Sequence, residues 1–212
     1  MKIGVLGSGD VAKTLAAGFL QHGYDVMMGT RDTSKLTEWK STHDTCALGS
    51  VDDTARFGEI LVLAVQGSAA VQALELVSPG VLDGKTIIDA TNPIDSKKPP
   101  VNGVFLYFTG VNDSLMELLQ RSFPAANFVK AFNSVGQSVM VNPQYEDGPP
   151  TMFICGNNES AKAQVANILP LFGWKPEDMG MAEAARPIES LCQLWCIRIF
   201  KGQDTHAFKL LT

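Results

Sequence analysis

A strand, a glycine turn and a helix open this chain. The apolar run Ile3–Leu6 stops at Gly7-Ser8-Gly9, and apolar residues at helical spacing follow from Leu15. A GxGxxA fingerprint needs this order, because Gly7 permits the tight turn, Gly9 lets a pyrophosphate approach the backbone and Ala12 lets the helix pack on the strand. The free N–H groups of the helix N-terminus then face the phosphates. The pattern predicts dinucleotide binding, with a purely structural glycine turn as the alternative.

The end of the next strand bears on the choice between NAD and NADP. We expect this strand over Asp25–Gly29, followed by Thr30 and Arg31. An NAD-binding chain usually places an acidic residue here for the ribose 2′-hydroxyl, and none is present at the strand end. The guanidinium of Arg31 is suited to gripping a 2′-phosphate and to stacking on adenine. The sequence therefore favours NADP(H), with a solvated turn arginine as the alternative.

The residues just beyond Arg31 extend this prediction. Ser34 and Lys35 lie one turn further on and are expected to join the 2′-phosphate site. Asp32 is the one acidic residue in this stretch. We expect it to cap a short helix that begins near Thr33, because Asp is a preferred N-cap residue.

Composition narrows the class of protein. The chain has 212 residues, of which 45% are apolar and 18% charged, which suits one α/β domain with a full core. The net charge of −5 argues against a nucleic-acid or anionic-membrane partner. The chain has no apolar run of about 18 residues, and its first strand leaves no room for a signal peptide. Its four cysteines lack disulfide-framework or zinc spacing, so we expect a cytoplasmic protein.

Strand and helix patterns alternate along the chain, which is typical of an α/β fold of the doubly wound Rossmann type with a mainly parallel sheet. Further strands are expected over 61–65, 86–90, 127–132 and 152–155, and helices over 68–76, 113–121 and 160–171. The segments 95–103 and 144–150 are expected to be exposed loops. We expect residues 1–180 to form the NADP-binding domain.

Residues 181–212 are expected to form a C-terminal helical segment, with the helical pattern starting at Ala182. Apolar residues occupy several faces of this helix, among them Leu191, Leu194 and Phe200. A helix that is apolar all round is buried all round. We therefore expect it to pack on the domain and on a second subunit, giving a homodimer.

Candidate cofactor contacts also follow from the strand ends. In open α/β sheets, ligands lie outside the carboxyl ends of the strands. Val65 and Gln66 are expected to contact the cofactor ribose or nicotinamide, Asn92 to hydrogen-bond the nicotinamide ribose, and Ala131 to form a small wall beside a planar ring. Ordinary turn chemistry is the alternative for all four.

No catalytic or metal-binding constellation is evident in the sequence. His22 is explained by a helix end, His43 lies in a polar connection and His206 is expected in the terminal helix. Cys192 and Cys196 lie four residues apart, and buried core thiols are a simpler explanation than a metal pair. Hydride transfer between NADPH and a flavin-like ring requires mainly close parallel stacking, so this absence suits that chemistry.

The chain resembles the NADPH-dependent deazaflavin oxidoreductases, and still more the cytosolic oxidoreductase domain of the six-transmembrane metalloreductases. The resemblance covers nearly the whole chain and rests on Gly7–Leu15, Gly29–Arg31, Asn92-Pro93, Val129–Asn133, Ile154–Gly156 and Asp178–Gly180. It implies a Rossmann fold with a longer sheet, bound NADP(H) and hydride delivery to a flavin or 5-deazaflavin. It also implies phosphate contacts at Ser8, Gly9, Asp10, Val11, Thr30 and Arg31, and nicotinamide-side contacts at Asn92 and near Ala131. Because Asp10 is unfavourable beside a pyrophosphate, we expect it to face the helix N–H groups.

The electron acceptor is where this chain departs from those families. Ser134–Ser138 replaces a stretch in which the metalloreductases carry a flavin-contacting aromatic residue. The leading hypothesis is an NADPH-dependent reductase of a flavin or 5-deazaflavin, a small-molecule redox acceptor. Two alternatives are a reductase of a small carbonyl or imine and a non-catalytic NADP(H)-binding sensor or partner subunit. The first needs a large helical domain, for which only about thirty residues remain after Gly180.

Overall fold

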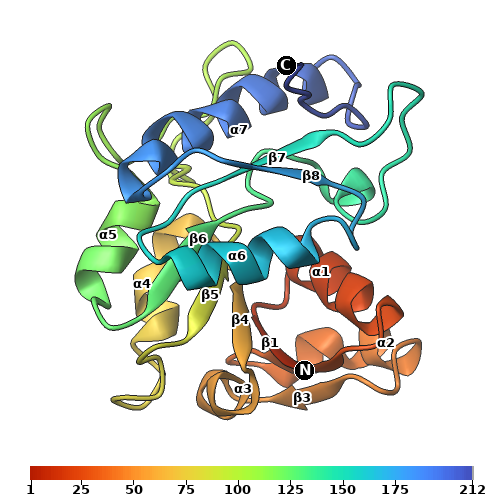
Figure 1. Cartoon of the computed structure of the whole chain (residues 1–212), viewed down its shortest axis with the longest axis vertical. Coiled ribbons are helices and arrows are strands. Elements are labelled where there is room, and N and C mark those ends of the chain that lie inside the picture. Colours follow the sequence, from red (N-terminus) through yellow and green to blue (C-terminus); the bar gives the residue numbers. More distant parts are fainter. Residues whose placement is uncertain (212) are drawn as a thin grey trace.

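The computed structural model describes residues 1–211 and contains a six-stranded parallel sheet in the order β3-β2-β1-β4-β5-β6 (Figure 1). The strands are β1 (Lys2–Leu6), β2 (Asp25–Gly29), β3 (Ala47–Gly49), β4 (Ile60–Leu63), β5 (Thr86–Asp89) and β6 (Asn127–Lys130). This order is that of the dinucleotide-binding Rossmann fold, with its switch point between β1 and β4. The predicted fold class is therefore confirmed.

Helices cover both faces of this sheet. They are α1 (Asp10–Gln21), α2 (Thr37–Ser41), α3 (Val51–Phe57), α4 (Ala70–Leu74), α5 (Leu115–Ser122) and α6 (Glu159–Ile168), with the 3₁₀ turns η1 (Thr33–Leu36), η2 (Gly67–Ala69) and η3 (Gln137–Val139). Leu15 of α1 and Val165 of α6 share one apolar cluster with Val5, whereas α3, α4 and α5 contribute to the cluster around Leu6. Successive residues of β1 thus serve opposite faces, as the period of a strand requires.

A second, smaller parallel sheet follows the first. It consists of β7 (Thr151–Ile154) and β8 (Lys175–Asp178), joined through α6. Lys130, at the end of β6, forms an antiparallel bridge with Cys155 just after β7. The two sheets therefore meet at the carboxyl end of β6.

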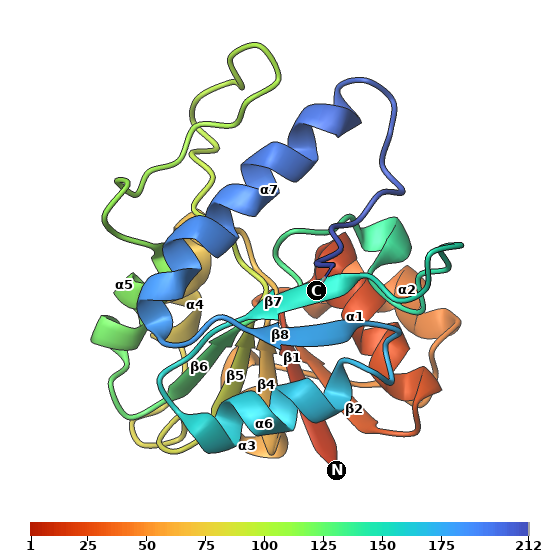
Figure 2. The ribbon, with the colours of Figure 1, turned by 45° about the horizontal axis from the view of Figure 1, so that its top comes forward.

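The C-terminal segment is only partly helical. After the turn η4 (Ala182–Ala184), α7 runs over Ala185–Ile199, and residues 200–211 return as irregular chain along β7 (Figure 2). The prediction of a helix containing His206 is wrong, because α7 ends at Ile199 and Gly202 then adopts a φ of +74°. The ring of His206 stacks on Trp195 at 4.6 Å between centroids. Thr212 lies outside the described residues.

The chain itself covers only part of α7, and the cover expected from a second subunit stays a prediction. Ile188 and Trp195 are buried, but Leu194, Ile199 and Phe200 are exposed. They share the upper edge of the molecule with the loop after β5 (Figure 2), where Val101, Phe108 and other apolar side chains are also exposed.

Several elements were not predicted. The strands β3 and β8 and the helix α3 lie outside the predicted elements, and β4 ends at Leu63 instead of Val65. The start of α3 carries a local signal, since the Ser50 hydroxyl accepts a hydrogen bond from the backbone N–H of Asp53. β3 consists of only three residues that lie at an edge of the sheet, so its sequence lacks a strand period.

A buried ion cluster joins β5 and β6 of the six-stranded sheet to α7. The ammonium of Lys130 lies 2.7 Å from Asp89 at the end of β5 and 2.8 Å from Glu189 of α7. It also donates to the carbonyl of Thr91 at 2.9 Å. The side chains of Lys130 and Asp89 are fully buried, and that of Glu189 is almost so.

No helix within residues 1–211 is long and apolar enough to cross a membrane.

Replacing Lys130 with Met should lower the free energy of unfolding by about 3–5 kcal/mol, because it leaves two buried carboxylates facing each other without a counter-charge. Urea denaturation followed by circular dichroism measures the change. Lys175→Met is the matched control, because Lys175 is exposed on β8 and forms no ion pair among the described residues. A loss for K130M no larger than that of the control would contradict this role of the cluster.

Candidate functional site

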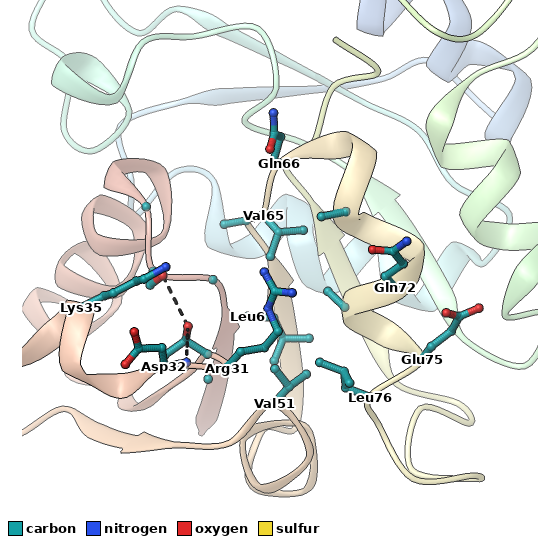
Figure 3. Close-up of a pocket in the computed structure, with 18 residues that line it drawn as sticks. Leu6, Arg31, Asp32, Lys35, Val51, Val65, Gln66, Gln72, Glu75 and Leu76 are labelled. Atoms are coloured by element: carbon teal, nitrogen blue, oxygen red, sulfur yellow. Dashed lines mark hydrogen bonds between the residues drawn. The ribbon is translucent and has the colours of Figure 1, made fainter. Parts of the chain in front are cut away.

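A pocket of about 550 Å³ lies at the carboxyl ends of β1, β2 and β4 (Figure 3). Three segments form its walls, namely the glycine turn after β1, the chain after β2, and the chain from the end of β4 into α4. Its lining comprises Leu6, Gly7, Ser8, Gly9, Gly29, Thr30, Arg31, Asp32, Lys35, Val51, Ala64, Val65, Gln66, Ala69, Gln72, Ala73, Glu75 and Leu76. The volume is in the range of a small-molecule or cofactor site.

The glycine turn has the geometry that a nucleotide fingerprint requires. Gly7 has a φ of +140°, and a Cβ built there would lie 2.3 Å from the carbonyl oxygen of Ala64. A Cβ built at Gly9 would have no atom of the described chain within 4 Å, so the space beside it is open. Gly9 is also the N-cap of α1, with no side-chain cap. The turn therefore presents bare backbone N–H groups to the open space, as an anionic group needs.

Asp10 and Val11 do not line this pocket. Asp10 lines a neighbouring groove that runs between α1, α2 and η3, together with Lys13 and Trp39. Its carboxylate accepts no hydrogen bond from the first turn of α1 among the described residues, contrary to the sequence-based prediction. The reason is its position, since the first residue of a helix directs its side chain outward, away from the N–H groups that follow it.

The end of β2 supplies most of the polar groups. The Thr30 hydroxyl donates to the Ser8 hydroxyl at 3.4 Å, which connects the β2 end to the glycine turn. Gly7 also donates its N–H to the carbonyl of Gly29 at 2.9 Å. The guanidinium of Arg31 stands inside the pocket in Figure 3 and forms no ion pair with any residue in the described part of the chain.

Asp32 caps η1 as predicted. Its carboxylate accepts hydrogen bonds from the Ser34 N–H at 3.0 Å and from the Ser34 hydroxyl at 2.6 Å, and these bonds hold the pKa of Asp32 below its usual value. The Ser34 hydroxyl is thereby directed at Asp32, and Ser34 does not line the pocket, whereas Lys35 does.

The nicotinamide-side candidates separate into two groups. Val65 and Gln66 line the pocket, but Asn92 and Ala131 do not. Asn92 forms a reciprocal pair with Asn133, in which the Asn92 amide donates to the Asn133 carbonyl at 2.8 Å and accepts from the Asn133 amide at 3.1 Å. Ala131 is fully buried, so it cannot form an open wall beside a ring in this conformation.

The backbone after β6 is constrained next to this amide pair. Phe132 has a φ of +61°, although it is neither Gly nor Asn, and its side chain is almost fully buried. Such a conformation costs of order 1–3 kcal/mol and persists where the surrounding structure imposes it. Here the next residue, Asn133, helps to impose the conformation, because its side-chain amide also donates a hydrogen bond to the carbonyl of Ile188 in α7 at 3.0 Å.

The sequence-based prediction missed the wall that α4 forms. Ala69, Gln72, Ala73 and Leu76 face the pocket at the i, i+3, i+4, i+7 spacing of one helix face, and Glu75 lies beside them. The helix was expected over 68–76, but its faces were not assigned. The available signal was this spacing in a helix that follows a strand ending at the switch point.

The histidines and the cysteine pair lie outside the pocket. His22 packs against Phe172, and His43 stacks on Trp39 at 4.0 Å between ring centroids. Cys192 and Cys196 are buried in α7 with their sulfur atoms 3.8 Å apart. No His, Tyr or Cys is among the described residues that line the pocket.

Comparisons with known proteins agree with this geometry. The family model for NADP oxidoreductases dependent on coenzyme F420 matches residues 2–93. A solved structure from Arthrobacter sp. FB24, provisionally described as an F420-dependent NADP reductase, superposes with a TM-score of 0.93 and 32% identity, covering 100% of both chains.

Two curated relatives match as well. Metalloreductase STEAP2 of Homo sapiens is 28% identical over 216 residues, which cover 99% of this chain and 39% of that protein. F420-dependent NADP reductase of Methanothermobacter thermautotrophicus is 36% identical over 105 residues, which cover 45% of each. The chain thus spans less than half the length of the metalloreductase, and its match to the Methanothermobacter reductase covers less than half of that protein.

Gly7 and Gly9 should respond differently to the same substitution. Gly7→Ala should destabilise the fold by more than 1 kcal/mol, because the added Cβ meets the Ala64 carbonyl at a strained φ. Gly9→Ala should change stability by less than about 0.5 kcal/mol, because its Cβ enters open space. Thermal unfolding of both variants measures the difference, and equal losses would contradict the geometry of the turn.

Proposed function

Because this chain belongs to the F420-dependent NADP oxidoreductase family, we propose that it transfers a hydride between NADPH and a flavin-like or 5-deazaflavin ring. The observation that carries the proposal is the pairing of two features in one pocket. Open space beside Gly9 adjoins the uncapped start of α1, and Arg31 and Lys35 line the pocket just after β2, where the one acid, Asp32, is hydrogen-bonded to Ser34. NADPH supplies the hydride when it is bound.

In this proposal, different residues of the pocket bind different parts of NADPH. The chain from Ser8 to the uncapped start of α1 offers backbone N–H groups to the pyrophosphate. Arg31 and Lys35 attract the 2′-phosphate, and Thr30 offers it a hydroxyl. Val65 and Gln66, at the end of β4, lie on the path from the adenosine side to the nicotinamide. Ser34 assists only indirectly, by engaging Asp32 and so keeping that carboxylate off the phosphate.

The lining of the pocket supports a ring acceptor over a carbonyl or an imine. Reduction of a carbonyl or imine needs a nearby acid to protonate the developing anion. The lining described above contains no His, Tyr or Cys, its Lys35 and Glu75 lie on the adenosine side of the proposed site, and the pKa of Asp32 is lowered by its bonds to Ser34. A flavin-like ring exchanges its ring-nitrogen proton with solvent, so it needs no such residue. The description of two relatives as F420-dependent reductases points the same way.

Arg31→Ala should weaken NADPH binding about ten- to a hundredfold, because it removes a charge-assisted contact of about 1.5–3 kcal/mol. NADH binding should change little, since NADH has no 2′-phosphate. Fluorescence titration with both nucleotides measures the effect. Arg56→Ala is a control, because Arg56 is exposed on α3 and pairs with Asp52 outside the pocket. Equal losses of affinity for NADPH and NADH would refute the assignment of Arg31 to the 2′-phosphate.

Assays of NADPH-dependent reduction test the identity of the electron acceptor. Purified protein with NADPH should reduce a flavin or a 5-deazaflavin, followed at the absorbance of the acceptor, and Gly9→Val should abolish this activity because its side chain fills the phosphate space. Turnover of a small aldehyde, ketone or imine without any ring reduction would support the carbonyl or imine reductase instead. NADPH binding without turnover of any of these acceptors would support a non-catalytic sensor or partner subunit.

We further propose that the protein works as a homodimer in the cytoplasm, without nucleic-acid or membrane partners. In this proposal residues 1–180 are the NADP-binding domain, and residues 181–212 contribute the dimer contact. Exposed Leu194, Ile199 and Phe200 on and after α7 support it, because contiguous apolar surface of this kind marks interfaces. Sedimentation velocity at micromolar concentration tests it, and a stable monomer would refute it.

A further inference from the structure

The two long walls of the pocket differ in charge. Arg31 and Lys35 lie on the wall formed by the chain after β2. The carboxylate of Asp32, on the same wall, accepts hydrogen bonds from Ser34, and in Figure 3 it points away from the interior of the pocket. On the opposite wall, formed by α4, the polar groups are Gln72 and Glu75, and both carry oxygen acceptors. The pocket therefore has cations on one side and hydrogen-bond acceptors on the other.

The apolar part of the α4 wall is shaped for a flat group. Ala69 and Ala73 leave space beside the helix, and Leu76 follows on the same face. Leu76 is 49% exposed, whereas its neighbours Leu74 and Val77 are buried. In Figure 3 the Leu76 side chain points across the pocket toward Arg31. An arginine fork opposite an exposed leucine forms a slot in which a planar ring stacks on the guanidinium.

A purine in that slot would turn one edge toward α4. Adenine carries a 6-amino donor beside ring-nitrogen acceptors, and a glutamine amide complements this combination with one acceptor and one donor. A carboxylate accepts from an amino group and repels a carbonyl oxygen. When the 2′-phosphate lies beside Arg31 and Lys35, the donor and acceptors on the base edge therefore face complementary groups on the α4 wall.

We propose that Gln72 and Glu75 are specificity-determining residues that read the amino edge of the adenine of NADP(H). The Gln72 amide pairs with the base, and the charge of Glu75 disfavours a purine with an oxygen at position 6. Glu75 is exposed and forms no ion pair among the described residues, so its carboxylate is free to turn toward a bound base. The proposal rests on NADP(H) binding in this pocket, as the proposed function states.

The test compares NADPH with its analogue in which hypoxanthine replaces adenine, so that a carbonyl stands in place of the amino group. Fluorescence titration should give wild-type protein about a tenfold preference for NADPH, the ratio expected for one hydrogen-bonded edge. Gln72→Met keeps the length of the side chain but removes its hydrogen bonds, so it should reduce the preference. Glu75→Gln removes the charge and allows an amide N–H to meet the carbonyl, so it should also reduce it.

A double variant of Gln72→Met with Glu75→Gln should bind the two nucleotides within about twofold of each other. Glu146→Gln is the charge-matched control, because Glu146 is exposed in the loop before β7 and does not line the pocket, and it should keep the wild-type ratio. Equal binding of both nucleotides by wild-type protein would overturn this proposal and leave the proposed function intact. A double variant that retains the tenfold preference would also overturn it. Failure of NADPH itself to bind would instead refute the proposed function, and this proposal with it.

Discussion

The buried cluster around Lys130 holds α5 and α7 against the carboxyl ends of β5 and β6. One ammonium meets two carboxylates there, from β5 and from α7, in a region without solvent. Burial by itself lowers the pKa of Lys130, but the charges of Asp89 and Glu189 outweigh burial and raise it. Burial raises the pKa of Glu189, although the adjacent Lys130 opposes the shift. Such a cluster is costly to break, because removing one member leaves an uncompensated buried charge.

The same cluster organises the elements around it. The Glu189 carboxylate accepts hydrogen bonds from the backbone N–H groups of Leu115 and Met116 at 3.0 and 3.1 Å. These N–H groups lie at the start of α5, where they have no partner within the helix. The cluster thus connects β5, β6, α5 and α7 at the carboxyl ends of the strands. The Asn92–Asn133 pair lies a few residues beyond it on the same two strands, and Asn133 makes its own contact with α7. On this side of the site, the amide N–H groups of Asn92 and Asn133 are hydrogen-bonded within the chain, whereas the side-chain oxygen of Asn133 is buried without a partner among the described residues.

The two halves of the site differ for this reason. The adenosine half is an open pocket with uncommitted groups, among them Arg31, Gln72 and the N–H groups at Gly9. In the other half Asn92 is paired, Ala131 is buried and Phe132 is held at a positive φ. The proposed nucleotide site therefore lies in the half whose polar groups are not engaged within the chain.

Features that depend on local chain chemistry were predictable from the sequence. The turn at Gly7, the extent of β2 and the cap that Asp32 provides for η1 each involve residues close together in the sequence, and each was predicted correctly. Tertiary structure alone decided the rest. The Lys130 cluster and the Asn92–Asn133 pair join residues far apart in the sequence, such as Leu115 and Glu189, which are separated by 74 positions. The pocket-facing side of α4, the burial of Ala131 and the end of α7 at Ile199 likewise depend on how elements pack, because burial and ion pairing are set by neighbours in space that no periodicity identifies.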